Sequence, residues 1–270
     1  MELKTIGYLV DRRVATITLN RPHRLNAWTG RMHTEYRWAL ERADHDADVR
    51  VVVVTGEGRA FCAGADAGAL EGHVEKGGYD PGTGADLANP GFGIRPEFDH
   101  DFAFHFGLRT PVIAAVNGPA AGVGLVLACY CDLRFAAAGA KLTTSHGRLN
   151  LPAEYGLSWV LPRIVGLGRA MDLLLSSRVV LAEEALELGL VNRLWPHEEL
   201  LSRTYEYAYG LAEGIAPRSL SETKRQVYVD QHRDVGTSID EARRLLEEMM
   251  TEPHFHEGVR ALSEKRDPSF

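Results

Sequence analysis

The pattern of apolar and polar residues along the chain predicts short strands and helices in alternation. Residues 6–10 and 14–19 are two β-forming runs separated by a charged tripeptide, which predicts a hairpin. Residues 26–47 carry large apolar side chains at a spacing closer to that of a helix than to that of a strand. Residues 51–54 are an unbroken run of valine, typical of a strand buried on both faces. The chain therefore begins with strand, strand, helix and strand.

The same alternation continues through the middle of the chain. An apolar run at 112–116 precedes a glycine-led apolar segment at 122–129, and a further β-forming run follows at 132–136. Alternating units of this kind predict a layered α/β fold in which crossover connections join the strands.

Two changes in composition divide the chain. Residues 71–100 are rich in glycine and proline, which predicts a long loop with at most short helical pieces, more often a lid or binding loop than neutral filler. From residue 200 onward the pattern becomes helical. We therefore expect a core over residues 1–199 and a helical C-terminal region over residues 200–270. The helices expected in that region cover residues 200–213, 219–231 and 239–251.

Composition and charge exclude several classes of protein. The 270 residues are 45% apolar and 25% charged, as in a soluble globular protein with one sizeable core. The net charge of −7 has the wrong sign for binding a nucleic-acid backbone. The N-terminus lacks the features of a secretory signal, no apolar stretch reaches membrane-spanning length, and three cysteines are too few for a disulfide framework. These features predict a cytoplasmic protein without nucleic-acid or membrane partners.

Two glycine-rich segments directly follow predicted strands and are the first candidates for chemistry. Residues 56–66 follow the strand that ends at Thr55, and residues 117–124 follow the strand that ends at Val116. Backbone N–H groups at a strand-to-helix turn are unpaired, and glycine or alanine leaves them open to a ligand. Two such turns on neighbouring strands could converge on one oxygen atom, as an oxyanion hole requires. The alternative is that these glycines only form tight turns.

A third segment, residues 143–166, completes a resemblance to a known family. The segments that carry it, in order over nearly the whole chain, are Phe61-Cys-Ala-Gly-Ala-Asp66, Pro111-Val-Ile-Ala-Ala-Val-Asn-Gly118, Cys131-Asp132, Leu161-Pro-Arg-Ile-Val-Gly166, Leu188-Gly-Leu-Val191 and Glu257-Gly-Val-Arg-Ala-Leu-Ser-Glu-Lys-Arg266. Together these segments resemble the crotonase superfamily, the enoyl-CoA hydratase/isomerase family. The resemblance implies a crotonase-like spiral of ββα units with a helical C-terminal trimerisation region, and so a homotrimer or a dimer of trimers.

The resemblance also implies the substrate and how it is bound. Members of the family bind an acyl-CoA thioester and stabilise its enolate with two backbone N–H groups, which fall here at Ala65 and Val123. The further positions that contact the substrate or its CoA are held by Arg24, Ala27, Asp66, Gly122 and Lys265. Asp66 alternatively caps the helix that follows it. No metal or redox cofactor is implied, because CoA enters only as part of the substrate.

The positions that hold the attacking water in hydratases of this family are altered. The two glutamates of those enzymes align with Val126 and His146, and valine can neither orient water nor transfer a proton. Glu154 aligns with the aspartate that dienoyl-CoA isomerases use to move a proton. His146 either titrates near neutral pH in the reaction or only forms a hydrogen bond within its loop. Glu154 is either a proton carrier with a raised pKa or a solvated turn residue.

These positions favour double-bond isomerisation of an acyl-CoA thioester by Glu154 over hydration. Two other functions stay open. His146 also resembles the histidine with which 6-oxocamphor hydrolase cleaves a carbon–carbon bond of a β-diketone without CoA. A chain that kept the fold and lost both glutamates would instead be a non-catalytic acyl-CoA binder.

Overall fold

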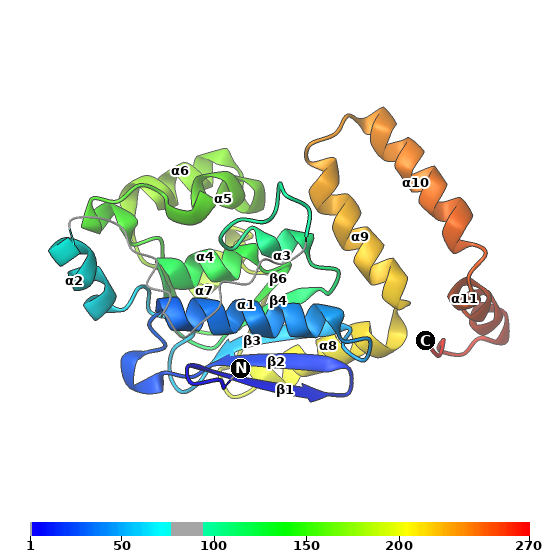
Figure 1. Cartoon of the computed structure of the whole chain (residues 1–270), viewed down its shortest axis with the longest axis horizontal. Helices are drawn as coiled ribbons and strands as arrows, with labels where there is room; N and C mark the ends of the chain where they lie inside the picture. Colours follow the sequence, from blue (N-terminus) through cyan, green and yellow to red (C-terminus); the bar gives the residue numbers. More distant parts are fainter. Residues whose placement is uncertain (1, 77–93) are drawn as a thin grey trace.

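A mixed sheet lies at the centre of the molecule, and the computed structural model describes it with the rest of residues 2–76 and 94–270 (Figure 1). Its strands are β1 (Ile6–Asp11), β2 (Val14–Leu19), β3 (Val51–Gly56), β4 (Val112–Val116), β6 (Leu133–Ala137) and β9 (Arg193–Trp195). In the described chain their order across the sheet is β1-β2-β3-β4-β6-β9. β1 and β2 pair antiparallel, and the later pairs are parallel. The predicted hairpin and the predicted α/β class are confirmed.

A smaller sheet extends from the carboxyl end of β4. Its strands are β5 (Ala120–Ala121), β7 (Lys141–Thr143) and β8 (Val180–Leu181), with β7 in the middle. β5 runs parallel to β7, with Ala120 opposite Leu142 and Ala121 opposite Thr143. Because β5 begins shortly after β4 ends, this pairing brings the segment after β7 to the carboxyl edge of the main sheet.

The main sheet is buried on both faces, as the valine run of β3 predicts. Val52 and Val54 join the apolar cluster on one face, whereas Val51 and Val53 join the cluster on the other. Successive side chains of a strand point to opposite faces, so a strand covered on both sides needs apolar residues at every position.

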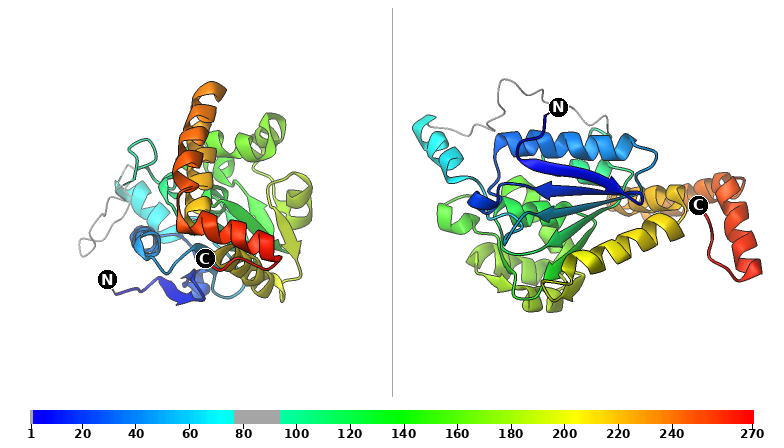
Figure 2. Two further views of the ribbon diagram at one scale, coloured as in Figure 1. Left: turned by 90° about the vertical axis from the view of Figure 1, so that its right-hand side faces the viewer. Right: turned by 90° about the horizontal axis from the view of Figure 1, so that it is seen from below.

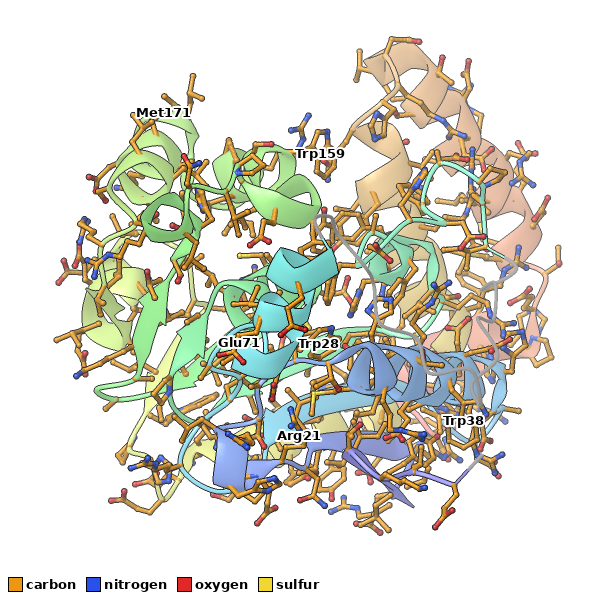
Figure 3. The ribbon with its side chains drawn as sticks, turned by 60° about the vertical axis from the view of Figure 1, so that its left-hand side comes forward. Arg21, Trp28, Trp38, Glu71, Trp159 and Met171 are labelled. Carbon is orange, nitrogen blue, oxygen red and sulfur yellow. The ribbon has the colours of Figure 1, made fainter. Side chains whose placement is uncertain are left out.

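Helices α1 (Gly30–His45) and α8 (Leu200–Gly214) cover the two faces of the sheet, and Figure 2 shows them on opposite sides of the strands. α1 begins later than the predicted start at residue 26. The reason is a cap, because the Thr29 side chain accepts a hydrogen bond from the N–H of Met32 at 3.2 Å. Trp38 lies within α1 (Figure 3).

Shorter helices connect the strands. They are α2 (Ala67–Lys76), α3 (Phe104–Gly107), α4 (Val123–Tyr130), α5 (Leu157–Val165), α6 (Leu167–Ser176) and α7 (Ala182–Glu187), with short 3-10 helices η1 (Pro22–Arg24), η2 (His146–Leu149) and η3 (Glu154–Gly156). The predicted loop over residues 71–100 thus opens with the second half of α2, and its residues 77–93 lie outside the described residues. No helix within residues 2–76 and 94–270 is both long and apolar enough to span a membrane.

Helices beyond α8 form a C-terminal arm that extends away from the sheet (Figures 1 and 2). They are α9 (Pro217–Asp230), α10 (Val235–Met249) and α11 (Pro253–Glu264). α8 to α10 match the three predicted helices with shifted ends, and α11 is an additional helix. α8 itself packs on the sheet rather than in the arm. A division of the chain into units at residue 199 stays a prediction.

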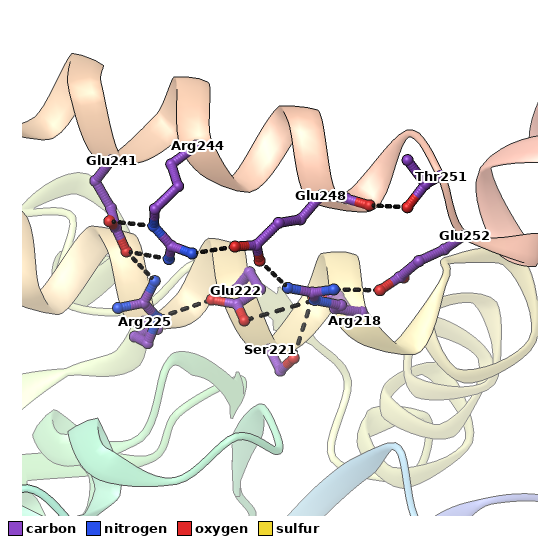
Figure 4. A network of polar contacts seen from close by, with 9 residues as sticks. All are labelled: Arg218, Ser221, Glu222, Arg225, Glu241, Arg244, Glu248, Thr251 and Glu252. Atoms are coloured by element: carbon purple, nitrogen blue, oxygen red, sulfur yellow. Dashed lines mark hydrogen bonds and ion pairs between the residues drawn. The ribbon is translucent and has the colours of Figure 1, made fainter.

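Alternating charges join α9 to α10 (Figure 4). Arg225 on α9 and Arg244 on α10 share the carboxylate of Glu241, at 2.7 and 3.0 Å. Arg218 on α9 contacts Glu248 on α10 at 2.9 Å. Isolated exposed ion pairs contribute little to stability, but charges that share partners form a network and contribute more to it. The network therefore supports the pairing of the two helices.

A buried lysine anchors the arm to the sheet. Lys224 on α9 is only 7% exposed, and its Nζ contacts Asp132 Oδ2 at 2.9 Å and the carbonyl of Thr110 at 3.0 Å. Tyr228, one turn further along α9, donates to the other carboxylate oxygen of Asp132 at 2.9 Å. Asp132 Oδ2 also accepts the N–H of Val112 at 2.6 Å. One aspartate therefore ties the arm to the start of β4.

We expect Lys224→Met to lower the free energy of unfolding by about 3 kcal/mol, because it leaves a largely buried carboxylate without its cation. Methionine keeps the apolar stem of lysine, so the loss reports the ion pair rather than packing. Urea unfolding measures the effect, with Arg243→Met as the matched control, since the Arg243–Asp240 pair is exposed on both sides. Equal losses in the two variants would contradict the anchoring role of Lys224.

Candidate functional site

The two glycine-rich turns lie side by side at the carboxyl edge of the main sheet. They follow β3 and β4, which are neighbouring parallel strands and so end at the same edge. Cys62 in the first turn forms a parallel bridge with Ala120 in the second, and its carbonyl accepts the N–H of Ala121 at 3.0 Å. A Cβ placed on Gly124 would lie 2.1 Å from that same carbonyl oxygen. Glycine at this position therefore permits the close approach of the two turns.

The two turns stay side by side as far as the predicted N–H donors. A Cβ placed on Gly122 would lie 3.9 Å from the Cα of Gly64, so these two residues are neighbours across the turns. Ala65 and Val123 are the next residues on each side. The structure therefore places the two predicted donors on adjacent segments of backbone.

The N–H of Ala65 points away from Trp28, whose backbone borders it on one side. The Gly64 carbonyl accepts the N–H of Trp28 at 2.8 Å, and the N–H of Asp66 donates to the Trp28 carbonyl at 2.9 Å. In a trans peptide the N–H lies opposite the preceding carbonyl, so the N–H of Ala65 points away from Trp28. No acceptor for this N–H occurs among the described residues.

Helix α4 begins at Val123 with an open N-terminus. Gly122 has a φ of +48°, and no side chain of the described residues caps the helix. The Gly122 carbonyl accepts the N–H of Val126 at 3.0 Å, so the N–H of Val123 on the same peptide points outward from the helix end. The described part of the chain offers this N–H no acceptor either. The partial positive charge of a helix N-terminus favours negative charge at this point.

Two asparagine side chains that the sequence analysis did not single out hold the first turn in place. Asn117 Nδ2 donates to the carbonyls of Gly56 at 2.9 Å and Gly58 at 2.8 Å, and its Oδ1 accepts the N–H of Gly56 at 3.1 Å. Asn26 Nδ2 donates to the carbonyl of Ala60 at 2.8 Å. An amide side chain directly after a buried strand is the sequence signal that could have identified Asn117.

β7 brings His146 to the same edge of the sheet. The N–H of Gly122 donates to the carbonyl of Thr143, the last residue of β7, at 3.1 Å, and η2 begins at His146 shortly afterwards. The imidazole is 7% exposed, and its Nδ1 is buried with no hydrogen-bond partner among the described residues. A buried ring nitrogen without a protein partner is available to a ligand.

Glu154 opens η3 and is half-buried. Its carboxylate forms no hydrogen bond or ion pair with the described residues. Burial raises the pKa of the Glu154 carboxyl above its ordinary value, and a positive charge on His146 acts against this rise. The two predicted catalytic side chains are therefore close enough to interact electrostatically. A partly buried carboxyl with a raised pKa is suited to carrying a proton near neutral pH.

Val126 lies one turn into α4, is 1% exposed and belongs to the apolar core. It offers no group that could hold water. The predicted catalytic positions therefore supply one carboxylate and one imidazole in place of two carboxylates. Within residues 2–76 and 94–270, no three histidine, cysteine, aspartate or glutamate side chains gather as a metal ion would need.

The predicted CoA contacts near the start of the chain gather around Asp66, and Figure 3 shows Arg21 and Trp28 close to α2. Asp66 Oδ1 accepts the N–H of Gly68 at 3.0 Å and so caps α2, while Oδ2 pairs with Arg21 at 2.9 Å. Burial would raise the pKa of Asp66, but the hydrogen bonds from Arg21 and Gly68 and the charge of Arg24 outweigh it and lower the pKa. Arg24 is exposed on η1 beside this pair.

Ala27 and Lys265 are placed differently. The N–H of Ala27 donates to the Arg24 carbonyl at 3.0 Å, and its carbonyl accepts from Arg21 at 2.6 Å, which leaves the carbonyl one lone pair for a ligand. Lys265 is exposed at the end of α11, in the arm, far from α2 (Figure 1). Within one chain the fold therefore does not bring Lys265 to the other candidate residues.

Comparison with known proteins identifies the family. A family model described as enoyl-CoA hydratase/isomerase matches residues 10–270. The probable enoyl-CoA hydratase EchA12 of Mycobacterium tuberculosis is 37% identical over 266 residues, which cover 95% of this chain and 89% of that protein. The 1,2-epoxyphenylacetyl-CoA isomerase of Escherichia coli is 33% identical over 263 residues, 97% of this chain and 96% of the relative.

The solved structures lead to the same family. A probable enoyl-CoA hydratase/isomerase from Mycobacterium abscessus superposes with a TM-score of 0.86 at 31% identity, and the match covers 98% of both chains. An enoyl-CoA hydratase from Bacillus anthracis gives a TM-score of 0.83 at 29% identity over 99% of both chains. The match extends through the core and the C-terminal arm alike, so the resemblance seen in the sequence is confirmed. This chain is an enzyme that belongs to the enoyl-CoA hydratase/isomerase family.

Proposed function

We propose that this enzyme isomerises a double bond in an acyl-CoA thioester. The N–H groups of Ala65 and Val123 bind the thioester oxygen, and Glu154 moves the proton. The observation that carries the proposal is a pair of N–H groups, without acceptors among the described residues, on adjacent turns at the sheet edge to which β7 also brings His146. Glu154 lies within electrostatic reach of His146. Removing a proton next to a thioester leaves an enolate with negative charge on oxygen, which two N–H donors and a helix N-terminus stabilise.

One proton carrier is enough for this reaction. Glu154 takes a proton from one end of the allylic system, the electrons spread into the thioester oxygen, and the same carboxyl returns the proton at the other end. No water is added, so the second carboxylate that hydratases need has no task here. The relative named as an isomerase of an acyl-CoA, at 33% identity, supports an isomerisation.

His146 supports a second candidate function, the hydrolytic cleavage of a carbon–carbon bond in a β-diketone. Its Nδ1 is buried and has no partner in the part of the chain that the structure describes, so the ring can donate to or accept from a ligand at this nitrogen. In that reaction His146 rather than Glu154 would be the essential group, and CoA would not be needed. A non-catalytic binder is the remaining alternative, and turnover of any of these substrates excludes it.

Three substrates separate these functions. The purified enzyme is offered a 3-enoyl-CoA, crotonyl-CoA and a cyclic β-diketone. Isomerisation leaves the mass unchanged, so it is followed by the ultraviolet absorbance of the conjugated 2-enoyl thioester, whereas hydration and cleavage are followed by mass spectrometry. We expect conversion of the 3-enoyl-CoA to the 2-enoyl-CoA, with little change in the diketone. Crotonyl-CoA hydration with kcat on the order of 100 per second or more would contradict our interpretation of Val126. Cleavage of the diketone without turnover of either thioester would establish the hydrolase.

Hydration should rise when the two carboxylates are restored. We expect the double variant Val126→Glu with His146→Glu to hydrate crotonyl-CoA faster than the parent, because two carboxylates can hold and split a water. The matched control is Val126→Gln with His146→Gln, which has the same side-chain size and no proton carrier. Equal hydration by both double variants would show that these positions do not limit the reaction.

We further propose that the enzyme works as a homotrimer or a dimer of trimers in the cytoplasm. The arm supports assembly, because it extends from the core and carries large apolar side chains that are exposed in one chain. These side chains are Val235, Ile239, Leu246, Met250, Phe255, Val259 and Leu262. Burying such a surface against further copies would stabilise the assembly.

A further inference from the structure

Tyr130 makes a contact that the proposed mechanism has not used. It is the last residue of α4 and is 4% exposed, and its hydroxyl donates to the carbonyl of Tyr155 at 2.7 Å. Burial raises the pKa of the Tyr130 phenol to about 12, so the hydroxyl keeps its proton and stays a donor. The ring is held by Phe102 and Phe106, whose centroids lie 6.3 and 5.0 Å away. The direction of the hydroxyl is therefore fixed by packing.

The carbonyl that Tyr130 binds belongs to a strained residue next to the proton carrier. Tyr155 directly follows Glu154 and has a φ of +50° and a ψ of +35°, a left-handed conformation that is unfavourable for a non-glycine residue. Such a conformation persists only where the surroundings hold it. Here they do so through the hydroxyl of Tyr130 and an edge contact with Phe102 at 5.2 Å.

Gly156 also restricts this turn. It has a φ of +71°, and a Cβ placed on it would lie 2.6 Å from the hydroxyl oxygen of Tyr130. The hydroxyl thus occupies the space that a side chain would fill. The backbone on the carboxyl side of Glu154 therefore has little freedom to move while Tyr130 is in place.

One helix connects this contact to the proposed oxyanion hole. Val123 and Tyr130 are the first and last residues of α4, two turns apart and therefore on the same face of the helix. All residues of α4 are buried. A rigid, buried helix of this kind fixes the distance between the N–H that receives the oxygen and the turn that carries the base.

We propose that Tyr130 is a positioning residue of this enzyme, whose hydroxyl holds the turn at Tyr155 and so keeps Glu154 at a fixed distance from the oxyanion hole. The inference rests on the proposed function, because it assigns Tyr130 a task only if Glu154 carries the proton. Misplacing a reacting group by about 1 Å can cost roughly 100-fold in rate. Tyr130 acts through Glu154 and does not touch the substrate in this role.

A double-mutant cycle between Tyr130→Phe and Glu154→Gln tests the proposal on the full-length enzyme with a 3-enoyl-CoA. Phenylalanine keeps the ring packing and removes only the hydroxyl. We expect Tyr130→Phe to lower kcat roughly 10- to 100-fold with KM nearly unchanged. In the Glu154→Gln background the same change should have no further effect, because the group that it positions is gone.

The matched control is Tyr205→Phe. Its hydroxyl pairs with Thr16 Oγ1 at 2.9 Å, and α8 places it on the opposite face of the sheet. We expect this variant to keep the kcat of the parent. A Tyr130→Phe enzyme with unchanged kcat, while Glu154→Gln is impaired, would overturn the positioning role and leave the proposed function intact.

The remaining outcomes are also decisive. Equal fold losses from Tyr130→Phe in both backgrounds would show a general structural effect and would overturn the proposal. If Glu154→Gln leaves kcat unchanged, the proposed function itself fails, whatever Tyr130 does. If the residual activity of Glu154→Gln is too low to measure, the Tyr130→Phe single variant decides. A lower kcat with KM nearly unchanged supports the positioning role, and any other result contradicts it.

Discussion

Glu154→Gln should lower kcat for isomerisation by roughly 100- to 10,000-fold and leave binding of the CoA thioester nearly unchanged. The amide keeps the shape of the carboxyl but cannot accept a proton, so the substitution slows the chemical step and lowers kcat. Steady-state kinetics with a 3-enoyl-CoA give kcat, and calorimetric titration with a non-reacting acyl-CoA gives the affinity. Exposed Glu198 provides the matched control, because Glu198→Gln makes the same chemical change away from the site.

His146→Gln should have the smaller effect on kcat and a distinct effect on its pH dependence. In the proposed function Glu154 is the base and must be ionised to act, so we expect activity to fall as the pH drops through its pKa, which burial has raised. A positive charge on His146 lowers this pKa. Removing the charge should move the acid limb of the kcat profile to higher pH. The opposite ranking, with His146 essential and Glu154 dispensable, would favour the hydrolase.

Gly124→Ala should reduce kcat by an amount comparable to the loss of one oxyanion donor, roughly 100- to 1000-fold. An added Cβ would lie 2.1 Å from the Cys62 carbonyl oxygen and 2.9 Å from the Cys62 Cβ, so the two turns must move apart. In the proposed function the N–H groups of Ala65 and Val123 reach one oxygen, and we expect that separating the turns prevents this. Steady-state kinetics measure the loss, and circular dichroism shows whether the variant is folded.

Gly210→Ala is the matched control for this change. Gly210 also lies within a helix, α8, but a Cβ placed on it meets no atom of residues 2–76 and 94–270 within 4 Å. The control should keep full activity and gain a little stability, because alanine favours the helix over glycine. A folded Gly124→Ala enzyme with the kcat of this control would show that the spacing of the two turns is not what stabilises the enolate.

The order of strands and helices could be predicted from the sequence because its signals are local. The valine run of β3 predicted a strand buried on both faces, and alternate valines do pack into two different clusters. The end of β4 and the start of α4 are likewise set by a short apolar run followed by glycines. The family resemblance rested on such segments, and the candidate residues followed from them position by position.

Helix ends were less well predicted, because caps depend on single side chains. α1 begins at Gly30, after the Thr29 cap, and α10 begins at Val235, after Asp234 accepts the N–H of Thr237 at 3.0 Å. Periodicity over many residues cannot locate such a point. Asp66 illustrates the same limit, since its pairing with Arg21 joins segments far apart in the sequence.

The sequence by itself determined the α/β class and the two glycine turns, and through the family resemblance it predicted that Val126 and His146 replace two hydratase carboxylates. Only the tertiary structure decided that the turns lie side by side and that Lys265 lies apart from them. It also revealed the contact of Tyr130 with Tyr155, 25 residues further along the chain. The physical reason is that such contacts depend on strand register and helix packing between distant segments, and no local pattern of apolar and polar residues specifies them.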